Sequence, residues 1–289
     1  MAIIEPVIRP PAEAGSFLLQ VTLGCSADHC SFCGAYKMKP FHVKDPEEVL
    51  SDIDRYSRRY PDTRRIFLMD GDALVLNNSK LIPILEKLES VFPRFSRVSA
   101  YANGSNITRK SDQELAELYA HKLSLLYMGL ESGSQLVLDR CRKTSSAEEM
   151  IQAVQRAERA GIRSSVIVLL GLGGKKHSAE HVRGTIEALN RMQPRYLSFL
   201  TLMAIPGTPL SEEVRRGDFA ELGSEELLKE SYEMIQGLEL KRTVFRSDHA
   251  SNYLALEGTF PRDKPVLLKA LKAAIDGTIT LRPDFARGL

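Results

Sequence analysis

The sequence lacks three features that would place a protein in a class at once. None of its 289 residues belongs to an apolar run long enough to span a bilayer, which argues against a membrane partner. Its 39 Lys and Arg are balanced by 37 Asp and Glu, whereas proteins that bind DNA are usually strongly basic. The first residues show no basic leader before an apolar segment. We therefore expect no signal peptide, a cytoplasmic location and no DNA partner.

Cysteine is also scarce, and we expect the four present to form no disulfide framework, because the expected compartment is reducing. Three of them, Cys25, Cys30 and Cys33, form a C-x4-C-x2-C triplet. Three thiolates on one loop can ligate three irons of a cubane cluster and leave the fourth iron open. Two other interpretations remain at this point. One is a structural zinc whose fourth ligand is His29 or His42, and the other is a redox pair at Cys30 and Cys33.

Segments typical of strands and of helices alternate through the first two thirds of the chain. We predict strands at residues 16–22, 65–69, 97–101, 124–130, 164–170 and 196–205. Helix starts are indicated by Asp45 before Pro46, and by Ser111 followed by Glu114. A helix-length segment after each strand indicates an α/β fold with a parallel sheet. The six units can close into a partial barrel or lie open as a doubly wound sheet.

The pattern changes after Pro206-Gly207-Thr208-Pro209. Beyond it we predict helices at 211–216, 224–238 and 265–275, with a short strand at 243–245. The prediction is therefore a domain of residues 1–210, with an N-terminal extension before the β/α units. A mainly helical C-terminal cap, residues 211–289, packs on the same core.

The cysteine loop and the strand ends together resemble the radical S-adenosylmethionine (SAM) superfamily. That family carries a cysteine triplet after the first strand, with an aromatic residue before the third cysteine, where Phe32 stands here. The first spacing is one residue longer than the common form. Asp70-Gly71-Asp72 after the second strand occupies the place of a glycine-rich motif. Residues 129–134 and 206–210 are similar to the subgroup of tRNA methylthiotransferases and oxygen-independent coproporphyrinogen oxidases.

The resemblance implies a partial (β/α)6 barrel of parallel strands and two cofactors. A [4Fe–4S] cluster would be held by Cys25, Cys30 and Cys33, and SAM would bind its open iron. The residues implied at the SAM are Phe32, Asp70, Gly71, Asp72, Glu131 and Ser132. Asp72 is the candidate for the amino group, Phe32 for the adenine, and Glu131 or Ser132 for the ribose.

The implied activity is reductive cleavage of SAM to a 5′-deoxyadenosyl radical, which abstracts hydrogen from a small organic substrate. A one-electron donor such as a flavodoxin or ferredoxin is implied as a partner. The alternatives are a zinc-binding structural or interaction protein with a Cys3His site, and a one-electron iron–sulfur carrier.

Some remaining residues have two interpretations each. Gly171-Leu172-Gly173-Gly174 fits neither a P-loop nor G-x-G-x-x-G, so it is a strand-to-helix turn or a place where Gly171 approaches the cofactor. His249 is a candidate acid/base group or substrate contact in the cap. Cys141 is an inert helix-end thiol, or one activated by its flanking bases. Lys37 and Lys39 are expected to offset a cluster's charge or to lie in solvent.

Overall fold

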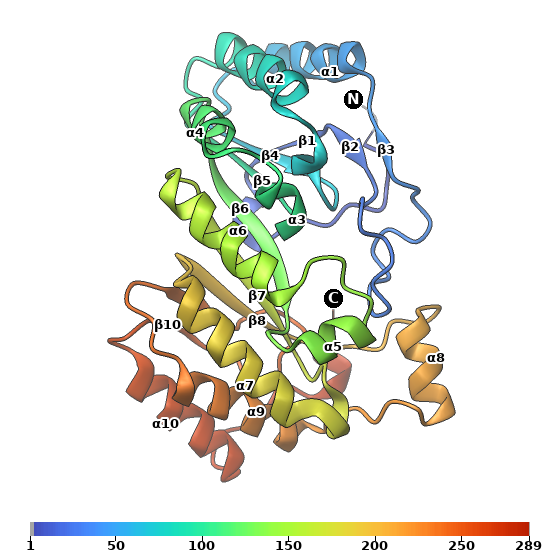
Figure 1. Cartoon of the computed structure of the whole chain (residues 1–289), viewed down its shortest axis with the longest axis vertical. Helices are drawn as coiled ribbons and strands as arrows, with labels where there is room; N and C mark the ends of the chain where they lie inside the picture. The colour runs from blue at the N-terminus through green and yellow to red at the C-terminus, as the bar shows by residue number, and fades with distance from the viewer. Residues whose placement is uncertain (1–2, 289) are drawn as a thin grey trace. The chain divides into compact units, whose positions relative to one another are not determined.

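The computed structural model describes residues 3–288, and Figure 1 labels its elements. These residues form two compact units, which we describe separately. Unit 1 contains the described residues up to His29, together with residues 33–128 and 156–164. Unit 2 contains residues 30–32, residues 129–155 and the described chain from Ser165 onward. The cysteine loop therefore passes from unit 1 to unit 2 at Cys30 and returns to unit 1 at Cys33.

Unit 1 is built on parallel strands in the order β1-β4-β5-β6. The strands are β1 (Phe17–Gln20), β4 (Arg65–Met69), β5 (Arg97–Tyr101) and β6 (Leu123–Glu131), of which β6 continues into unit 2 at Gly129. Their residues are mostly buried, as expected for a parallel sheet covered by helices. The predicted strands at 65–69 and 97–101 are confirmed at both ends.

The helices of unit 1 are α1 (Pro46–Arg59), α2 (Asn78–Val91), α3 (Gly104–Thr108) and α4 (Asp112–Ala120). Two of them, α1 and α4, begin where capping chemistry predicts, whereas α2 and α3 have no side-chain cap. The Asp45 carboxylate accepts a hydrogen bond from the Glu47 N–H at 2.8 Å. Ser111 and Glu114 form a capping box at the start of α4. The shorter elements are η1 (Pro11–Glu13), η2 (Ala73–Val75) and the antiparallel pair β2 (Thr22–Leu23) and β3 (His42–Val43).

Unit 2 continues the alternation with parallel strands β7, β8 and β9, and β10 runs antiparallel to β9. The strands are β7 (Arg163–Leu170), β8 (Tyr196–Thr201), β9 (Val244–Arg246) and β10 (Glu257–Thr259). The helices are α5 (Gln135–Arg140), α6 (Ala147–Arg159), α7 (Gly174–Met192), α8 (Pro209–Arg216), α9 (Ser224–Gly237), α10 (Lys264–Ile275) and η3 (Asp284–Ala286). The first two residues of β7 and the last four of α6 belong to unit 1. The core includes Phe199, Phe245 and Phe260, which stack edge to face. Helices α8, α9 and α10 lie where C-terminal helices were predicted, whereas the strand β10 was not predicted.

The predicted sixth strand, 196–205, is too long, because β8 ends at Thr201. At Thr201, side chains from a loop of the C-terminal region supply hydrogen-bond partners in place of a neighbouring strand. The Thr201 N–H donates to Ser251 Oγ at 3.0 Å, and the Thr201 hydroxyl donates to Asn252 Oδ1 at 2.8 Å. Side-chain partners of this kind are invisible to a strand prediction based on local apolar pattern.

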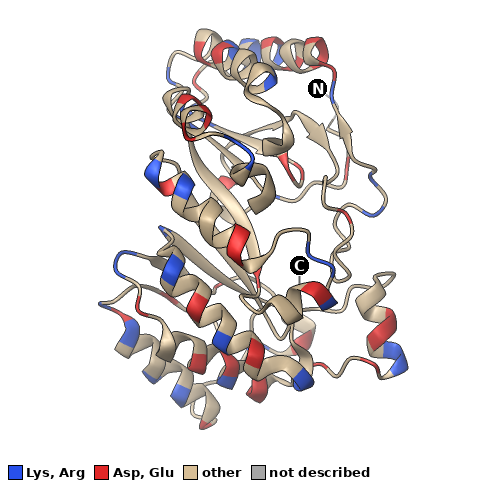
Figure 2. Ribbon diagram, viewed as in Figure 1, with Lys and Arg blue, Asp and Glu red and all other residues tan. Residues whose placement is uncertain are grey.

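The fold class is confirmed as α/β, with mostly parallel strands and intervening helices. The domain division at residue 210 remains a prediction. Basic and acidic residues are interspersed along the helices rather than gathered on one element (Figure 2). No helix within residues 3–288 combines the length and the apolar character needed to cross a membrane.

Candidate active site

Unit 1 holds two of the three predicted cluster ligands, Cys25 and Cys33, whose side chains are partly exposed. Cys30 belongs to unit 2 and is buried. None of the cysteines within residues 3–288 forms a disulfide. In the same described part, no group of three His, Cys, Asp or Glu side chains is already arranged to hold a metal ion. Binding of a metal commonly orders its own ligands.

The turn Asp70-Gly71-Asp72 forms a cradle for the segment Gly24-Cys25-Ser26. The Gly24 N–H donates to the Asp70 carboxylate at 3.0 Å, and the Ser26 hydroxyl donates to the Asp72 carboxylate. Between them, the Gly71 N–H donates to the Gly24 carbonyl at 2.8 Å. A Cβ on Gly71 would lie only 2.6 Å from Cys25 Sγ, so glycine is required for this approach. The three residues therefore fix the backbone on both sides of Cys25.

Asp70 also forms an ion pair with Lys39, which follows the cysteine triplet in the sequence. Its carboxylate is fully buried and pairs with Lys39 Nζ at 2.7 Å. Burial raises the Asp70 pKa, and the hydrogen bond and charge of Lys39 act against that rise. Lys39 itself is buried and donates to the Ile4 carbonyl at 2.6 Å, so the expectation that it lies in solvent is wrong. A buried pair of this kind positions the chain, and removing one partner costs roughly 3–5 kcal/mol.

Asp72 is surrounded by hydrogen-bond donors of unit 1. Besides Ser26, it accepts from the side-chain amides of Asn103, at 3.0 Å, and of Asn106. Burial raises its pKa, and these hydrogen bonds partly oppose the rise. Sequence reasoning missed these two asparagines, and their position just after β5 was the one signal that could have found them. Whether Asp72 also binds the amino group of SAM stays a prediction.

Tyr36, which follows the cysteine triplet, lies near Cys25 and Cys33 in unit 1. Burial is the largest cause of its raised pKa, and the charges of Tyr101, Asp70 and the two cysteines add to it. The phenol is therefore neutral at physiological pH. His29 and His42, the candidates for a fourth zinc ligand, are both exposed, and His29 contacts Asp28 at 3.1 Å.

In unit 2, the segment Cys30-Ser31-Phe32 is held by its backbone. The Ser31 N–H donates to the Cys141 carbonyl at 2.9 Å, and the Ser31 carbonyl accepts from the Leu210 N–H at 3.0 Å. The Phe32 side chain packs against an apolar cluster of Val137, Cys141, Leu172, Leu202, Leu210 and Phe219. An apolar wall beside Phe32 is compatible with its predicted place at an adenine ring.

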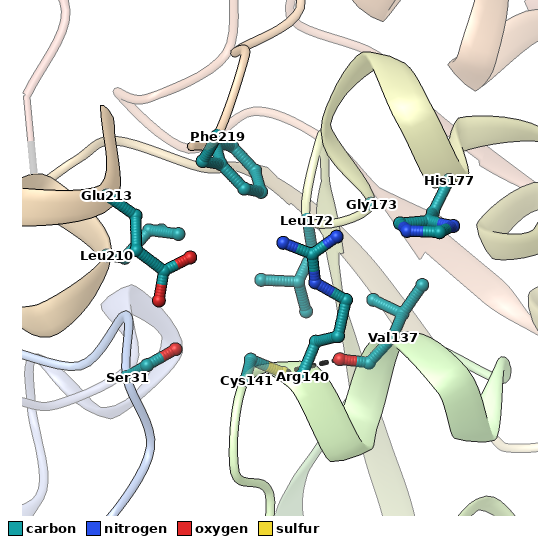
Figure 3. Close-up of a pocket in the computed structure, with 10 residues that line it drawn as sticks. All are labelled: Ser31, Val137, Arg140, Cys141, Leu172, Gly173, His177, Leu210, Glu213 and Phe219. Carbon is teal, nitrogen blue, oxygen red and sulfur yellow. Dashed lines mark hydrogen bonds between the residues drawn. The ribbon is translucent and has the colours of Figure 1, made fainter. Parts of the chain in front are cut away.

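Figure 3 shows a pocket that Ser31 of this segment helps to line. Ser31, Cys141, Leu172, Leu210 and Phe219 line it, and the ionisable side chains of Arg140, His177 and Glu213 also face it. All the residues that line this pocket belong to unit 2.

Of the two interpretations of Cys141, the structure supports an inert thiol at a helix end rather than one activated by its flanking bases. Burial raises its pKa to about 12, with a smaller contribution from Cys30. Its Sγ donates to the Val137 carbonyl at 3.1 Å within the last turn of α5. The neighbouring Lys143 opposes the rise in pKa but does not reverse it. A thiol with so high a pKa is not a nucleophile at neutral pH.

The last residue of β6, Glu131, and the first residue after it, Ser132, are the residues predicted to lie near the ribose. Glu131 has φ of 61°, a left-handed conformation that is disfavoured for a residue with a side chain. Its carboxylate pairs with Lys143 Nζ at 3.2 Å. The next residue, Ser132, is fully buried, and its Oγ lies 2.8 Å from His181 Nδ1. The structure therefore presents Glu131 more openly than Ser132.

The turn after β7 is a strand-to-helix connection that leads into α7. Gly171 has φ of +82°, which only glycine adopts readily. Its N–H donates to the Glu230 carboxylate of α9 at 2.6 Å. Sequence reasoning missed both His181 and Glu230, because only their tertiary contacts distinguish them. An approach of Gly171 to a cofactor stays a prediction.

His181 and Glu230 have opposite pKa shifts, and these predict a pH dependence of stability. Burial lowers the His181 pKa to about 4 and raises the Glu230 pKa to about 7. Folding therefore loses the contribution of Glu230 as the pH rises toward 7, and loses that of His181 as the pH falls below about 6.5. The two slopes, each at most about 1.4 kcal/mol per pH unit, cancel in the wild type between about pH 5 and 6.

The corresponding variants should show the slopes separately. We expect the unfolding free energy of Glu230→Gln to rise with pH from 5 to 6.5 relative to the wild type, and that of His181→Asn to fall. Denaturant unfolding at several pH values measures both. Parallel curves for the wild type and the two variants would contradict the assignment.

His249 lies in the loop that meets the end of β8. Its Nδ1 accepts from the Ser251 N–H at 3.2 Å and lies 2.9 Å from Ser251 Oγ. Burial lowers its pKa, although the Asp248 charge acts in the opposite direction. A neutral imidazole with an engaged Nδ1 leaves Nε2 for other contacts. Its role as an acid/base group or substrate contact stays a prediction.

Comparisons with known proteins agree on one family. The model of the radical SAM superfamily matches residues 19–189. A protein of Methanocaldococcus jannaschii whose name describes it as a methylthiotransferase is 22% identical over 148 residues. That match covers 48% of this chain and 32% of the relative, so the chain spans about a third of the relative's length.

Solved structures show the same fold at low sequence identity. Coproporphyrinogen III oxidase from Escherichia coli, a radical SAM enzyme, is 15% identical with a TM-score of 0.56, over 76% of this chain and 50% of that one. The radical SAM methyltransferase of Kitasatospora setae, solved with cobalamin and a [4Fe–4S] cluster, is 17% identical with a TM-score of 0.56. Its match covers 70% of this chain and 39% of that one. Methylornithine synthase gives 13% identity and a TM-score of 0.55, over 89% and 68%.

Proposed function

The chain belongs to the radical SAM superfamily, and from that membership we propose that Cys25, Cys30 and Cys33 hold a [4Fe–4S] cluster to which SAM binds. When bound, the cluster supplies one electron that breaks a carbon–sulfur bond of SAM, giving methionine and the 5′-deoxyadenosyl radical that takes a hydrogen atom from the substrate. The protein's task is binding, orientation and exclusion of water.

The observation that carries the proposal is the cradle around Cys25. Asp70 and Asp72 hold the residues on either side of this cysteine, and Gly71 leaves room for its side chain. The donor set fits the cluster, because three thiolates leave one iron available to the amino and carboxylate groups of SAM.

Three features of the structure support the contacts that the resemblance implies. The partly open Glu131 carboxylate can accept hydrogen bonds from a ribose. The apolar cluster next to Phe32 can cover an adenine ring. Asp72 can bind an ammonium group only if that group replaces one of the hydrogen-bond donors that Asp72 has now. Its hydrogen bond from Ser26, which supports the cysteine loop, is therefore better supported than a contact with SAM. We propose a small organic substrate, and a flavodoxin or ferredoxin as the electron donor.

The proposal is tested by anaerobic reconstitution with iron and sulfide. We expect about four irons per chain, a brown protein, and conversion of SAM to 5′-deoxyadenosine after reduction. The EPR spectrum of the reduced cluster should change on addition of SAM, since SAM binds the open iron. A single zinc without sulfide would support the structural-zinc alternative. An EPR spectrum unaffected by SAM would support the electron carrier.

A further inference from the structure

Three buried polar side chains of unit 2 join the turn after β6, the turn after β7 and helix α9. Ser132 and His181 are fully buried and Glu230 is 2% exposed. Burying polar groups costs free energy unless they bond one another, and an apolar set of similar volume packs without that cost. The mechanism proposed above gives no task to His181 or Glu230.

The hydrogen bonds show which groups of this network donate and which accept. The Ser134 N–H donates to Ser132 Oγ at 3.1 Å, so the Ser132 hydroxyl can direct its own proton to His181 Nδ1, 2.8 Å away. The neutral ring then carries its proton on Nε2. Within the described residues, Nε2 makes no hydrogen bond of normal geometry, although the Leu169 backbone beside the ring acts against the lowering of the His181 pKa. The closest carboxylate oxygen to Nε2 is Oε1 of Glu230 at 3.7 Å.

A serine, a histidine and a glutamate in this order resemble a nucleophilic triad. The burial of Ser132 excludes that role, because no substrate can reach a hydroxyl with no exposed surface. The network therefore acts on the backbone around it.

The backbone that it holds is otherwise unfavourable. Glu131, next to Ser132, keeps a left-handed conformation that persists only where neighbouring contacts enforce it. His181 supplies such a contact through Ser132. Glu230 does the same for the second turn, where its carboxylate accepts the Gly171 N–H at 2.6 Å and the Ser178 hydroxyl.

We propose that His181 and Glu230 are positioning residues for SAM, which hold the turns at Glu131–Ser132 and at Gly171 in the binding conformation. This inference rests on the proposed function and names residues outside the predicted contacts. Because neither residue touches SAM in this scheme, their loss should weaken SAM binding without changing the chemistry of the bound cofactor.

The test compares breaking and conservative variants. His181→Leu and Glu230→Leu should raise the KM for SAM by about tenfold or more, with kcat for 5′-deoxyadenosine within about twofold. His181→Asn keeps an amide near the position of Nδ1, and Glu230→Gln keeps an acceptor for Gly171, so both should recover most of the affinity. Amide exchange in the apoprotein should become faster at residues 131–134 in His181→Leu and at 171–174 in Glu230→Leu.

Thr243→Val is the matched control, because Thr243 is a buried residue of unit 2 whose hydroxyl donates to the Pro194 carbonyl, away from both turns. It should lower the melting temperature without changing KM. The inference is overturned if the leucine variants behave like this control while the wild type cleaves SAM. A wild type that is fully loaded with cluster but forms no 5′-deoxyadenosine would instead overturn the proposed function.

Discussion

Replacing Cys25, Cys30 or Cys33 singly by alanine should abolish assembly of the [4Fe–4S] cluster. A cubane held by three protein thiolates has no spare protein ligand, so each loss leaves two irons without protein support. Even residues that only support a metal ligand change affinity by roughly 10–100-fold, and loss of a ligand itself should exceed that. Iron and sulfide content, the visible spectrum and 5′-deoxyadenosine formation measure the outcome after anaerobic reconstitution.

Cys141→Ala is the control, since the Cys141 thiol is buried and has a pKa of about 12. It should load with iron and form 5′-deoxyadenosine as the wild type does, with only a small loss of stability. Equal loss of iron in all four variants would show that general unfolding, rather than ligation, explains the result. Retention of a full cluster in any of the first three would show that the triplet is not the ligand set.

The secondary structure followed from local chemistry where that chemistry is self-contained. Strands at 65–69 and 97–101 are continuous apolar or β-favouring runs, and their bounds are confirmed. Asp45 and Ser111 mark helix starts because their side chains bond amides only two or three residues away. The end of β8 was predicted wrongly because its partners, Ser251 and Asn252, lie about fifty residues along the chain.

The site was predictable to the extent that its residues adjoin one another in sequence. The cysteine triplet and Asp70-Gly71-Asp72 stand out as motifs. The hydrogen bonds by which Asp70-Gly71-Asp72 holds the residues around Cys25 are tertiary contacts. Neither motif alone predicts them. Lys39 shows the same limit, because a lysine in a polar loop is usually exposed. Its burial is explained by distant acceptors, the Asp70 carboxylate and the carbonyls of Ile4 and Pro6.

His181 and Glu230 show the limit most clearly. Each lies on an amphipathic helix among ordinary neighbours, and their link to Ser132 and Gly171 spans 49 and 59 residues. No spacing rule connects such positions, so buried polar groups of this kind are found only by asking where each one finds its partners.

The second large effect is expected from Gly71→Ala, which should prevent cluster assembly although it removes no ligand. The new Cβ would overlap the Cys25 side chain, at 2.6 Å from its Sγ. Cys25 has little freedom to retreat, because Gly24 and Ser26 are bonded to the two flanking aspartates. Overpacking of this kind costs roughly 1–3 kcal/mol, and here the displaced atom is the thiolate that must meet the iron.

Gly223→Ala provides the comparison, since a Cβ there would have its nearest neighbour at an ordinary 3.6 Å. This variant should load iron normally. For Gly71→Ala we expect a folded apoprotein, judged by circular dichroism and a cooperative melting transition, that takes up little iron and sulfide. Full loading of Gly71→Ala would mean that the turn can move away from Cys25 at little cost. The aspartates would then be packing elements of unit 1 rather than supports of the cysteine loop.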